Sequence, residues 1–194
     1  TKAIEINPNY AYAYAARGLI KNSLEDYKGA IADYTKAIEI NPNYNYVYSN
    51  RGSAKNSLKD YKGAIADYTK AIEINSNSAY DFNERGKSKY ELKDFIGAIA
   101  DLTKAIDLYP NYDNAYAYRA KCYYSLASFT KAKIDSSKAI ELNPENGFYY
   151  YLRAWHNYKL GKNSNACSDM KKAVELEYYF DDIEELTNLA NCTP

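Results

Sequence analysis

The chain has 194 residues, and its 25 acidic and 25 basic side chains give a formal net charge of zero. A balanced charge offers no broad field to attract nucleic acid or an anionic membrane. No apolar run reaches the ~18–20 residues of a membrane-spanning helix. We therefore expect no nucleic-acid partner and no membrane insertion.

The chain contains an internal sequence repeat, because its first ten residues, TKAIEINPNY, recur at residues 35–44. We interpret residues 1–10 as the end of a truncated repeat and expect the polypeptide to be a piece of a longer one. Related motifs follow at intervals of 34 residues: NPNY at Asn7 and Asn41, NSNS at Asn75, YPNY at Tyr109 and NPEN at Asn143. This period predicts five repeats and a tail: 11–44 (repeat 1), 45–78 (repeat 2), 79–112 (repeat 3), 113–146 (repeat 4), 147–180 (repeat 5) and 181–194.

Each repeat is expected to form two helices. The first should begin after the N-cap residues Asn9, Asn43, Asn77 and Asn111, and the second after Asp26, Asp60, Asp94 and Ser128. Helices of about 12–15 residues are marginal alone in water. The repeats must therefore stack on one another to be stable.

Several positions within the 34-residue repeat hold one kind of residue. Position 8 is Gly or Ala, positions 20 and 27 are always Ala, and position 4 is Tyr or Phe. Together with the period, this pattern resembles the tetratricopeptide repeat (TPR) family. The resemblance implies an all-α, right-handed superhelical solenoid of two-helix units, with the first helices lining a concave groove. It also implies a non-catalytic scaffold for protein–protein interaction.

Arginine and aspartate each occupy one fixed position. All five arginines lie at position 7, where the family usually has Leu, and position 23 is always Asp. The planar guanidinium pairs with a carboxylate through two bonds, which Lys cannot do. We predict structural ion pairs between helices, within a repeat or between neighbouring repeats, among Arg17, Asp33, Arg51, Asp67, Arg85, Asp101, Arg119, Asp135, Arg153 and Asp169.

A concave face would present positions 2, 5, 9 and 12 of the repeats, by analogy with the family. These positions hold aromatic and amide side chains, with some Lys toward the C-terminal half, a combination that suits a peptide ligand. Packing along the ridge is the alternative role for each Tyr. The predicted peptide-binding residues are Tyr12, Tyr46, Tyr80, Asn83, Lys87, Tyr90, Asn114, Lys121, Tyr124, Tyr151, Trp155 and Tyr158.

The family's best-known ligand mode clamps the acidic C-terminus of chaperones through Lys, Asn and Arg at fixed positions. When the first position of this clamp is aligned with repeat 1, its five positions are occupied here by Ala15, Leu19, Asn50, Tyr80 and Glu84. Only Asn50 fits, and Glu84 reverses a charge. A co-factor that binds chaperone tails is therefore not expected.

Catalytic signatures are missing from the sequence, so we expect no enzyme, no cofactor and no metal site. No phosphate loop, nucleophile elbow or metal-ligand spacing occurs, and the single histidine, His156, is expected to pack. Cys122, Cys167 and Cys192 are expected to be reduced thiols. Reduced thiols would slightly favour a cytoplasmic location, and the compartment is otherwise undetermined.

The tail, residues 181–194, is expected to form a helix that caps the last repeat. The leading functional hypothesis is a scaffold that binds a peptide or protein segment in the groove. Two alternatives remain: a solenoid that forms homo-oligomers through its repeat ends, and an array that presents substrates to an enzyme domain of a longer protein.

Overall fold

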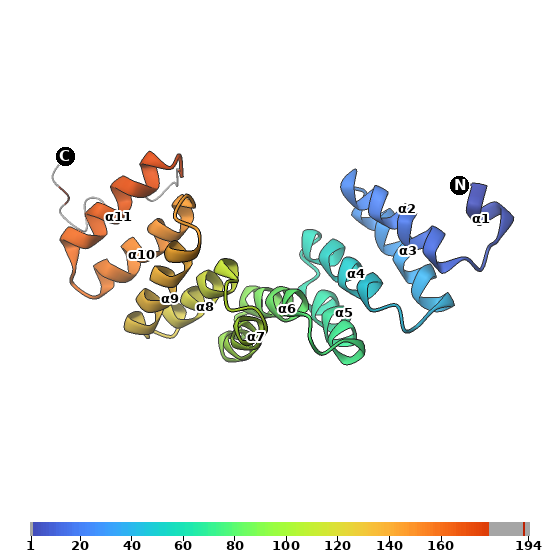
Figure 1. The fold of residues 1–194 in the computed structure, drawn as a ribbon, viewed down its shortest axis with the longest axis horizontal. Coiled ribbons are helices and arrows are strands. Elements are labelled where there is room, and N and C mark those ends of the chain that lie inside the picture. The colour runs from blue at the N-terminus through green and yellow to red at the C-terminus, as the bar shows by residue number, and fades with distance from the viewer. Residues whose placement is uncertain (1, 179–191, 193–194) are drawn as a thin grey trace. The chain divides into compact units, whose positions relative to one another are not determined.

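A computed structural model describes residues 2–178 and 192. The described residues form helices and no strands (Figure 1). The helices are α1 (Lys2–Ile6), α2 (Ala11–Ser23), α3 (Tyr27–Ile40), α4 (Asn45–Ser57), α5 (Tyr61–Ile74), α6 (Ala79–Glu91), α7 (Phe95–Leu108), α8 (Asp113–Ser125), α9 (Phe129–Leu142), α10 (Gly147–Lys159) and α11 (Asn163–Glu175). The all-α fold class is thus confirmed, and the first helix of each repeat begins 34 residues after the previous one.

Two compact units divide the chain, Thr1–Asp94 and Phe95–Pro194. In the first unit α2 packs on α3 and α4 on α5, while α3 and α5 each also contact the helix that follows. In the second unit α8 packs on α9 and α10 on α11, and α9 also contacts α10. Within each unit the first helices of successive repeats also touch, α2 with α4, α4 with α6, and α8 with α10. This arrangement buries the faces that would leave an isolated helix pair unstable.

The helix pairs meet at small residues. The alanines at positions 20 and 27 are completely buried in every repeat, from Ala30 and Ala37 to Ala166 and Ala173. In repeat 1 the ring of Tyr34 lies directly over Gly18, and a Cβ there would be 2.7 Å from Tyr34 Cε1. Position 8 is glycine in repeats 1 and 2, where position 24 is Tyr, and also in repeat 3, where position 24 is Leu102. It is alanine in repeats 4 and 5, where position 24 is Ser136 or Met170.

The turn inside each helix pair has the same backbone shape in all five repeats. Its residue at position 15 is left-handed, with φ between 55° and 69°, at Glu25, Lys59, Lys93, Ala127 and Gly161. The following helix is capped in repeats 1 and 2, where Asp26 and Asp60 accept hydrogen bonds from the amides of Gly29 and Gly63.

The predicted N-caps of the first helices are one residue too early. The cap residues are Tyr10, Tyr44, Ser78, Tyr112 and Asn146. A different Asn, two residues before each predicted cap, stabilises the turn that precedes the helix. The side-chain Oδ1 of this Asn accepts a hydrogen bond from the backbone amide of the predicted cap residue. The pairs are Asn7 with Asn9, Asn41 with Asn43, and Asn75 with Asn77.

The expectation of three reduced thiols is wrong for two of them. Cys167 and Cys192 form a disulfide, while Cys122 is a buried thiol. Their Cα atoms are 5.5 Å apart although 25 residues separate them in sequence, a proximity that sequence spacing cannot reveal. The disulfide removes the basis for a cytoplasmic location. The predicted capping helix lies outside the described residues, apart from Cys192, which is not helical.

No described helix is long and apolar enough to cross a bilayer.

Candidate functional site

The arginines of four repeats each bind the aspartate of their own repeat. Arg17 Nε and Nη2 donate to the two carboxylate oxygens of Asp33 at 2.8 and 2.6 Å. The same two-pronged bond joins Arg51 to Asp67, Arg119 to Asp135, and Arg153 to Asp169. Position 7 therefore pairs with position 23 of the same repeat. The pair between Arg85 and Asp101 stays a prediction.

The third guanidinium nitrogen points to the preceding repeat. Arg51 Nη1 donates to Thr35 Oγ1 at 3.0 Å, and Arg85, Arg119 and Arg153 do the same to Thr69, Thr103 and Ser137 at 3.1, 3.0 and 3.5 Å. Each guanidinium also lies 5.4–5.6 Å from the ring at position 4 of its repeat. One side chain thus joins both helices of a repeat to the repeat before it.

The aspartates in these pairs are buried. Burial alone would raise the pKa of Asp33, but the hydrogen bonds from Arg17 and Lys21 outweigh it and hold that pKa below its usual value. Arg17, Arg51, Arg119 and Arg153 are each bound by the aspartate of their own repeat, so these four do not form a row of free cations for an acidic ligand.

The first helices of the N-terminal unit expose aromatic side chains. Tyr12 is 57% exposed and Tyr80 is 45% exposed. Between them in sequence, Tyr46 is half-buried, and its ring stands edge-on to that of Tyr44 with centroids 4.6 Å apart. Burial and a hydrogen bond from one hydroxyl to the other raise the pKa of Tyr46. Exposed tyrosine rings offer large contact areas at low cost in side-chain entropy.

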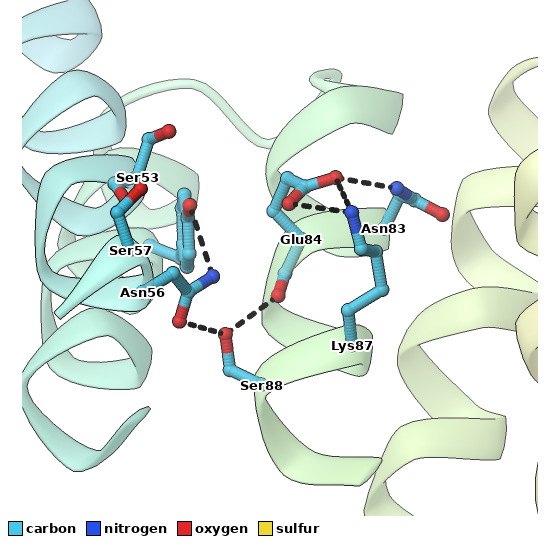
Figure 2. Close-up of polar contacts among 8 residues, drawn as sticks. Ser53, Asn56, Ser57, Asn83, Glu84, Lys87 and Ser88 are labelled. Atoms are coloured by element: carbon cyan, nitrogen blue, oxygen red, sulfur yellow. Dashed lines mark hydrogen bonds and ion pairs between the residues drawn. The ribbon is translucent and has the colours of Figure 1, made fainter. Parts of the chain in front are cut away.

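A polar network lies beside these tyrosines, where α4 contacts α6. Figure 2 shows the Ser88 hydroxyl between Asn56 Oδ1, at 2.9 Å, and the carbonyl oxygen of Glu84, at 2.8 Å. Lys87 Nζ binds both carboxylate oxygens of Glu84 at 2.9 and 3.0 Å. Asn83 was predicted to face a ligand, but it is completely buried and its Nδ2 donates to Glu84. The side-chain amide of Asn83 therefore holds the carboxylate of Glu84 in place. Glu84 was not among the predicted peptide-binding residues.

The C-terminal unit carries a second aromatic group on α8 and α10. Lys121 Nζ lies 4.7 Å from the ring centroid of Tyr118 and 6.0 Å from that of Phe148. The Phe148 ring stacks on Tyr151, with centroids 6.4 Å apart, and Tyr178 contacts both rings. We had not predicted Tyr118 or Tyr178 as site residues, because they fall outside the positions chosen by analogy with the family.

The remaining predicted residues have different surroundings. The rings of Trp155 and Tyr158 contact each other edge-on at 6.1 Å, and both pack against a small core with Met170. Tyr124 contacts Phe129 and His156, Asn114 is half-buried beside Asp113, and Tyr90 is half-buried on α6. Tyr124 is therefore partly a packing residue.

The single histidine is buried between helices. His156 is 1% exposed, its Nδ1 lies 3.0 Å from Ser136 Oγ, and burial lowers its pKa to about 4. A neutral imidazole that solvent does not reach is a packing residue. Among the described residues, no three His, Cys, Asp or Glu side chains could hold a metal ion together.

These features define an all-helical repeat protein with aromatic first-helix surfaces. TPR family models match residues 11–44, 46–78 and 114–146, which together make up just over half of the chain. The chain therefore belongs to the tetratricopeptide repeat family. No curated protein matches the sequence.

Solved structures of TPR proteins share the fold. A crystal structure of MamA is 26% identical, with a TM-score of 0.77, over 82% of this chain and 94% of MamA. YrrB, described as a TPR protein with an unusual peptide-binding site, is 21% identical, with a TM-score of 0.79, over 97% of both chains. The first TPR of Spaghetti (RPAP3), bound to the HSP90 peptide SRMEEVD, is 26% identical, with a TM-score of 0.59, over 60% of this chain and 93% of that chain.

Proposed function

We propose that this chain is a non-catalytic protein-interaction scaffold that binds an extended peptide segment along the first helices of its repeats. The observation that carries the proposal is the exposure of two large aromatic side chains on first helices, Tyr12 of α2 and Tyr80 of α6. Glu84 and Lys87 add polar groups on α6. Aromatic residues in such settings dominate the binding energy of protein interfaces. The likeness to YrrB, which has an unusual peptide-binding site, and to the first TPR of Spaghetti (RPAP3), which binds an HSP90 peptide, supports the same function.

The chemistry of this surface favours a peptide without an acidic terminus. At the places where the chaperone-tail clamp requires cations, this chain has Tyr80 and Glu84. Lys87, the nearest cation, is already paired with Glu84 at 2.9 Å. We therefore expect an uncharged or apolar segment, whose side chains pack on the tyrosines and whose backbone bonds to polar groups.

A selection from a library of random displayed peptides tests the proposal. We expect the chain to enrich a set of related peptides, and Tyr80→Ala to weaken their binding by about tenfold, as truncation of an interface anchor does. Tyr109→Ala is the matched control, because Tyr109 is 52% exposed but lies in the loop after α7. A selection without enrichment, or equal losses in the two variants, would contradict the proposal.

Self-association is a second candidate, favoured by apolar side chains at the N-terminal helices. Ile6 is 77% exposed, Ile20 is 62% exposed and Leu24 is 74% exposed. Exposed apolar groups that lie near one another often mark protein contacts. Sedimentation over a dilution series tests this candidate, since a mass that does not change with concentration and equals one chain would exclude it.

A further inference from the structure

A disulfide joins α11 to a residue 25 positions further along the chain. Cys167 belongs to α11, and its partner is Cys192, near the C-terminus. Both residues are half-buried, whereas Cys122 in α8 is completely buried. Exchange between a disulfide and a thiol requires access to the sulfur atoms. A thiol in solution can therefore reach the bond between Cys167 and Cys192 but not Cys122.

The disulfide brings Cys192 to the core of repeat 5. Ala154 of α10 and Met170 of α11, two helices that lie side by side (Figure 1), form this core and are 0% and 4% exposed. Three partly buried residues pack against the core, namely Cys192, Trp155 and Tyr158. Trp155 and Tyr158 are predicted peptide-binding residues. The same small core thus supports the disulfide and two side chains of the proposed peptide surface.

In earlier repeats, the first helix of the next repeat covers the residue equivalent to Met170. Tyr34 of repeat 1 is completely buried in a cluster that includes residues of α4. Ser136 of repeat 4 is buried against His156 of α10. α11 is the last helix in the described part of the chain. Cys192 therefore contributes to the cover of Met170 that a following first helix provides in those repeats.

α11 lacks two features that stabilise second helices elsewhere in the chain. Position 17 is aromatic in repeats 1–4 but is Asn163 in repeat 5. In repeat 4 this aromatic residue is Phe129, whose ring centroid lies 5.4 Å from that of Tyr124. The start of α11 at Lys162 has no side-chain cap, whereas aspartate caps the equivalent helix in repeats 1 and 2. A terminal repeat also gains less from neighbours, so we expect α11 to open more readily than α3 or α5.

We propose that the disulfide between Cys167 and Cys192 is a redox-sensitive switch that keeps repeat 5 closed. A dithiol reductant operates it: one thiolate attacks a sulfur of the bond to form a mixed disulfide, and the second thiolate of the reductant then displaces that sulfur. The reductant is oxidised to an intramolecular disulfide, and Cys167 and Cys192 take up its two electrons and two protons as thiols. Without the bond Cys192 leaves the core, and α11 separates from α10.

The consequence for ligand binding rests on the proposed function. Trp155 and Tyr158 keep their positions only while Ala154 and Met170 stay packed against them, so reduction should remove repeat 5 from the peptide surface. The opening itself involves no ligand and is measured without one. A peptide selection that enriches nothing would therefore contradict the proposed function and leave the switch unaffected.

Hydrogen exchange of the full chain, followed by mass spectrometry with and without dithiothreitol, tests the opening. We expect amide protection in α11 to fall by on the order of 100-fold on reduction, which is the stabilisation that a disulfide closing a loop of this size provides. Protection in α3 and α5 should not change. Trp155 is the only tryptophan of the chain, so its fluorescence emission is a second readout and should shift to longer wavelength on reduction.

Two serine variants separate the switch from other effects of the reductant. Cys122→Ser adopts the residue at the same position of repeat 3, Ser88, and should respond to dithiothreitol as the native chain does. Cys192→Ser should show the exchange and the Trp155 emission of the reduced chain, and dithiothreitol should change neither. The switch would be overturned by equal α11 protection in the oxidised and reduced native chain, or by a response to dithiothreitol that persists in Cys192→Ser. Alkylation of all three cysteines after unfolding without reductant would contradict the disulfide itself.

Discussion

Arg51 Nη1 donates a 3.0 Å hydrogen bond to Thr35 Oγ1, which belongs to the preceding repeat. The other nitrogens of the same guanidinium hold Asp67 at 3.0 and 2.6 Å. Solenoids gain stability from contacts within repeats and between neighbours, and this one side chain contributes to both. The position of each repeat relative to the one before is therefore specified by directed hydrogen bonds as well as by apolar packing.

Thr35→Val should weaken this contact between repeats. Valine keeps the shape of threonine but leaves Arg51 Nη1 without its acceptor, and it also removes the 2.7 Å bond from Thr35 Oγ1 to the carbonyl of Ile31. We expect a loss of about 1–3 kcal/mol in the free energy of unfolding, measured by urea denaturation. Thr35→Ser keeps the hydroxyl and serves as the control. Equal stability of Val and Ser variants would show that the bond between repeats contributes nothing.

Arg119→Lys should destabilise the second unit although it preserves the charge. Lysine cannot reproduce the fork that binds Asp135 at 2.7 and 2.9 Å and Thr103 at 3.0 Å. We expect a loss of about 1–3 kcal/mol in the free energy of unfolding, because charge-assisted bonds are lost at a buried acid. Lys138→Arg, at an exposed i,i+3 pair with Glu141, is the control and should change little. A fully stable Arg119→Lys variant would rule out the two-pronged pair as a source of stability.

Gly18→Ala should destabilise repeat 1 although alanine favours helix. The added methyl would lie 2.7 Å from Tyr34 Cε1, and overpacking of this kind costs about 1–3 kcal/mol. The gain in helix propensity is only about 1 kcal/mol. Gly52→Ala should cost less, because its nearest contact, Tyr68 Cζ, is 3.0 Å away.

A double-mutant cycle isolates the contact between Gly18 and Tyr34. In a Tyr34→Leu background, which adopts the residue type of Leu102 at the same repeat position, Gly18→Ala should become stabilising by up to about 1 kcal/mol. An effect of Gly18→Ala that is the same in both backgrounds would show that the tyrosine ring does not set the need for glycine.

The sequence was sufficient to predict the helix pairs because every repeat restates the same interface. Ala30, Ala37 and their equivalents mark the contact between helices in each copy, so a local pattern is confirmed several times over. Arg17 and Asp33 were also identified from their positions, but the choice between a pair within a repeat and one between repeats required the geometry of the side chains.

The departures from the repeat were harder to predict, since a residue that breaks the pattern has no second copy to explain it. The Cα atoms of Cys167 and Cys192 are 5.5 Å apart although 25 residues separate them in sequence, and no periodic feature indicates that proximity. Asn83 occupies a position of the groove by analogy, yet it is completely buried and its Nδ2 donates to Glu84. Tertiary packing, which differs from repeat to repeat, decides how far each such side chain reaches solvent.

Ala127→Gly should stabilise the turn between α8 and α9. Ala127 has a φ of 55°, and a left-handed conformation costs a residue with a Cβ about 1–2 kcal/mol. Glycine avoids this cost but loses more backbone entropy on folding, about 0.5–1 kcal/mol. We expect a net gain of up to about 1 kcal/mol by thermal or urea denaturation. Gly161, at the equivalent position of repeat 5, provides the converse test, since Gly161→Ala should be destabilising.

The single histidine should make stability depend on pH in a definite window. Burial lowers the pKa of His156 to about 4, from 6.5 for a free side chain, so the unfolded chain takes up a proton at a higher pH than the folded chain. Its contribution is complete above about pH 6.5 and is lost as the pH falls toward 4, by about 3 kcal/mol.

Proton NMR can follow this titration without ambiguity, because the chain contains one histidine. The imidazole resonance should titrate near pH 4 in the folded chain. Asp33 is a separate acid-sensitive group, because its lowered pKa confines its effect to pH values below about 3.8. In His156→Gln the loss of stability between pH 6.5 and 4 should disappear while the loss at lower pH remains. A resonance that titrates near pH 6.5 would mean that water reaches the imidazole and that the helices around it are not closed.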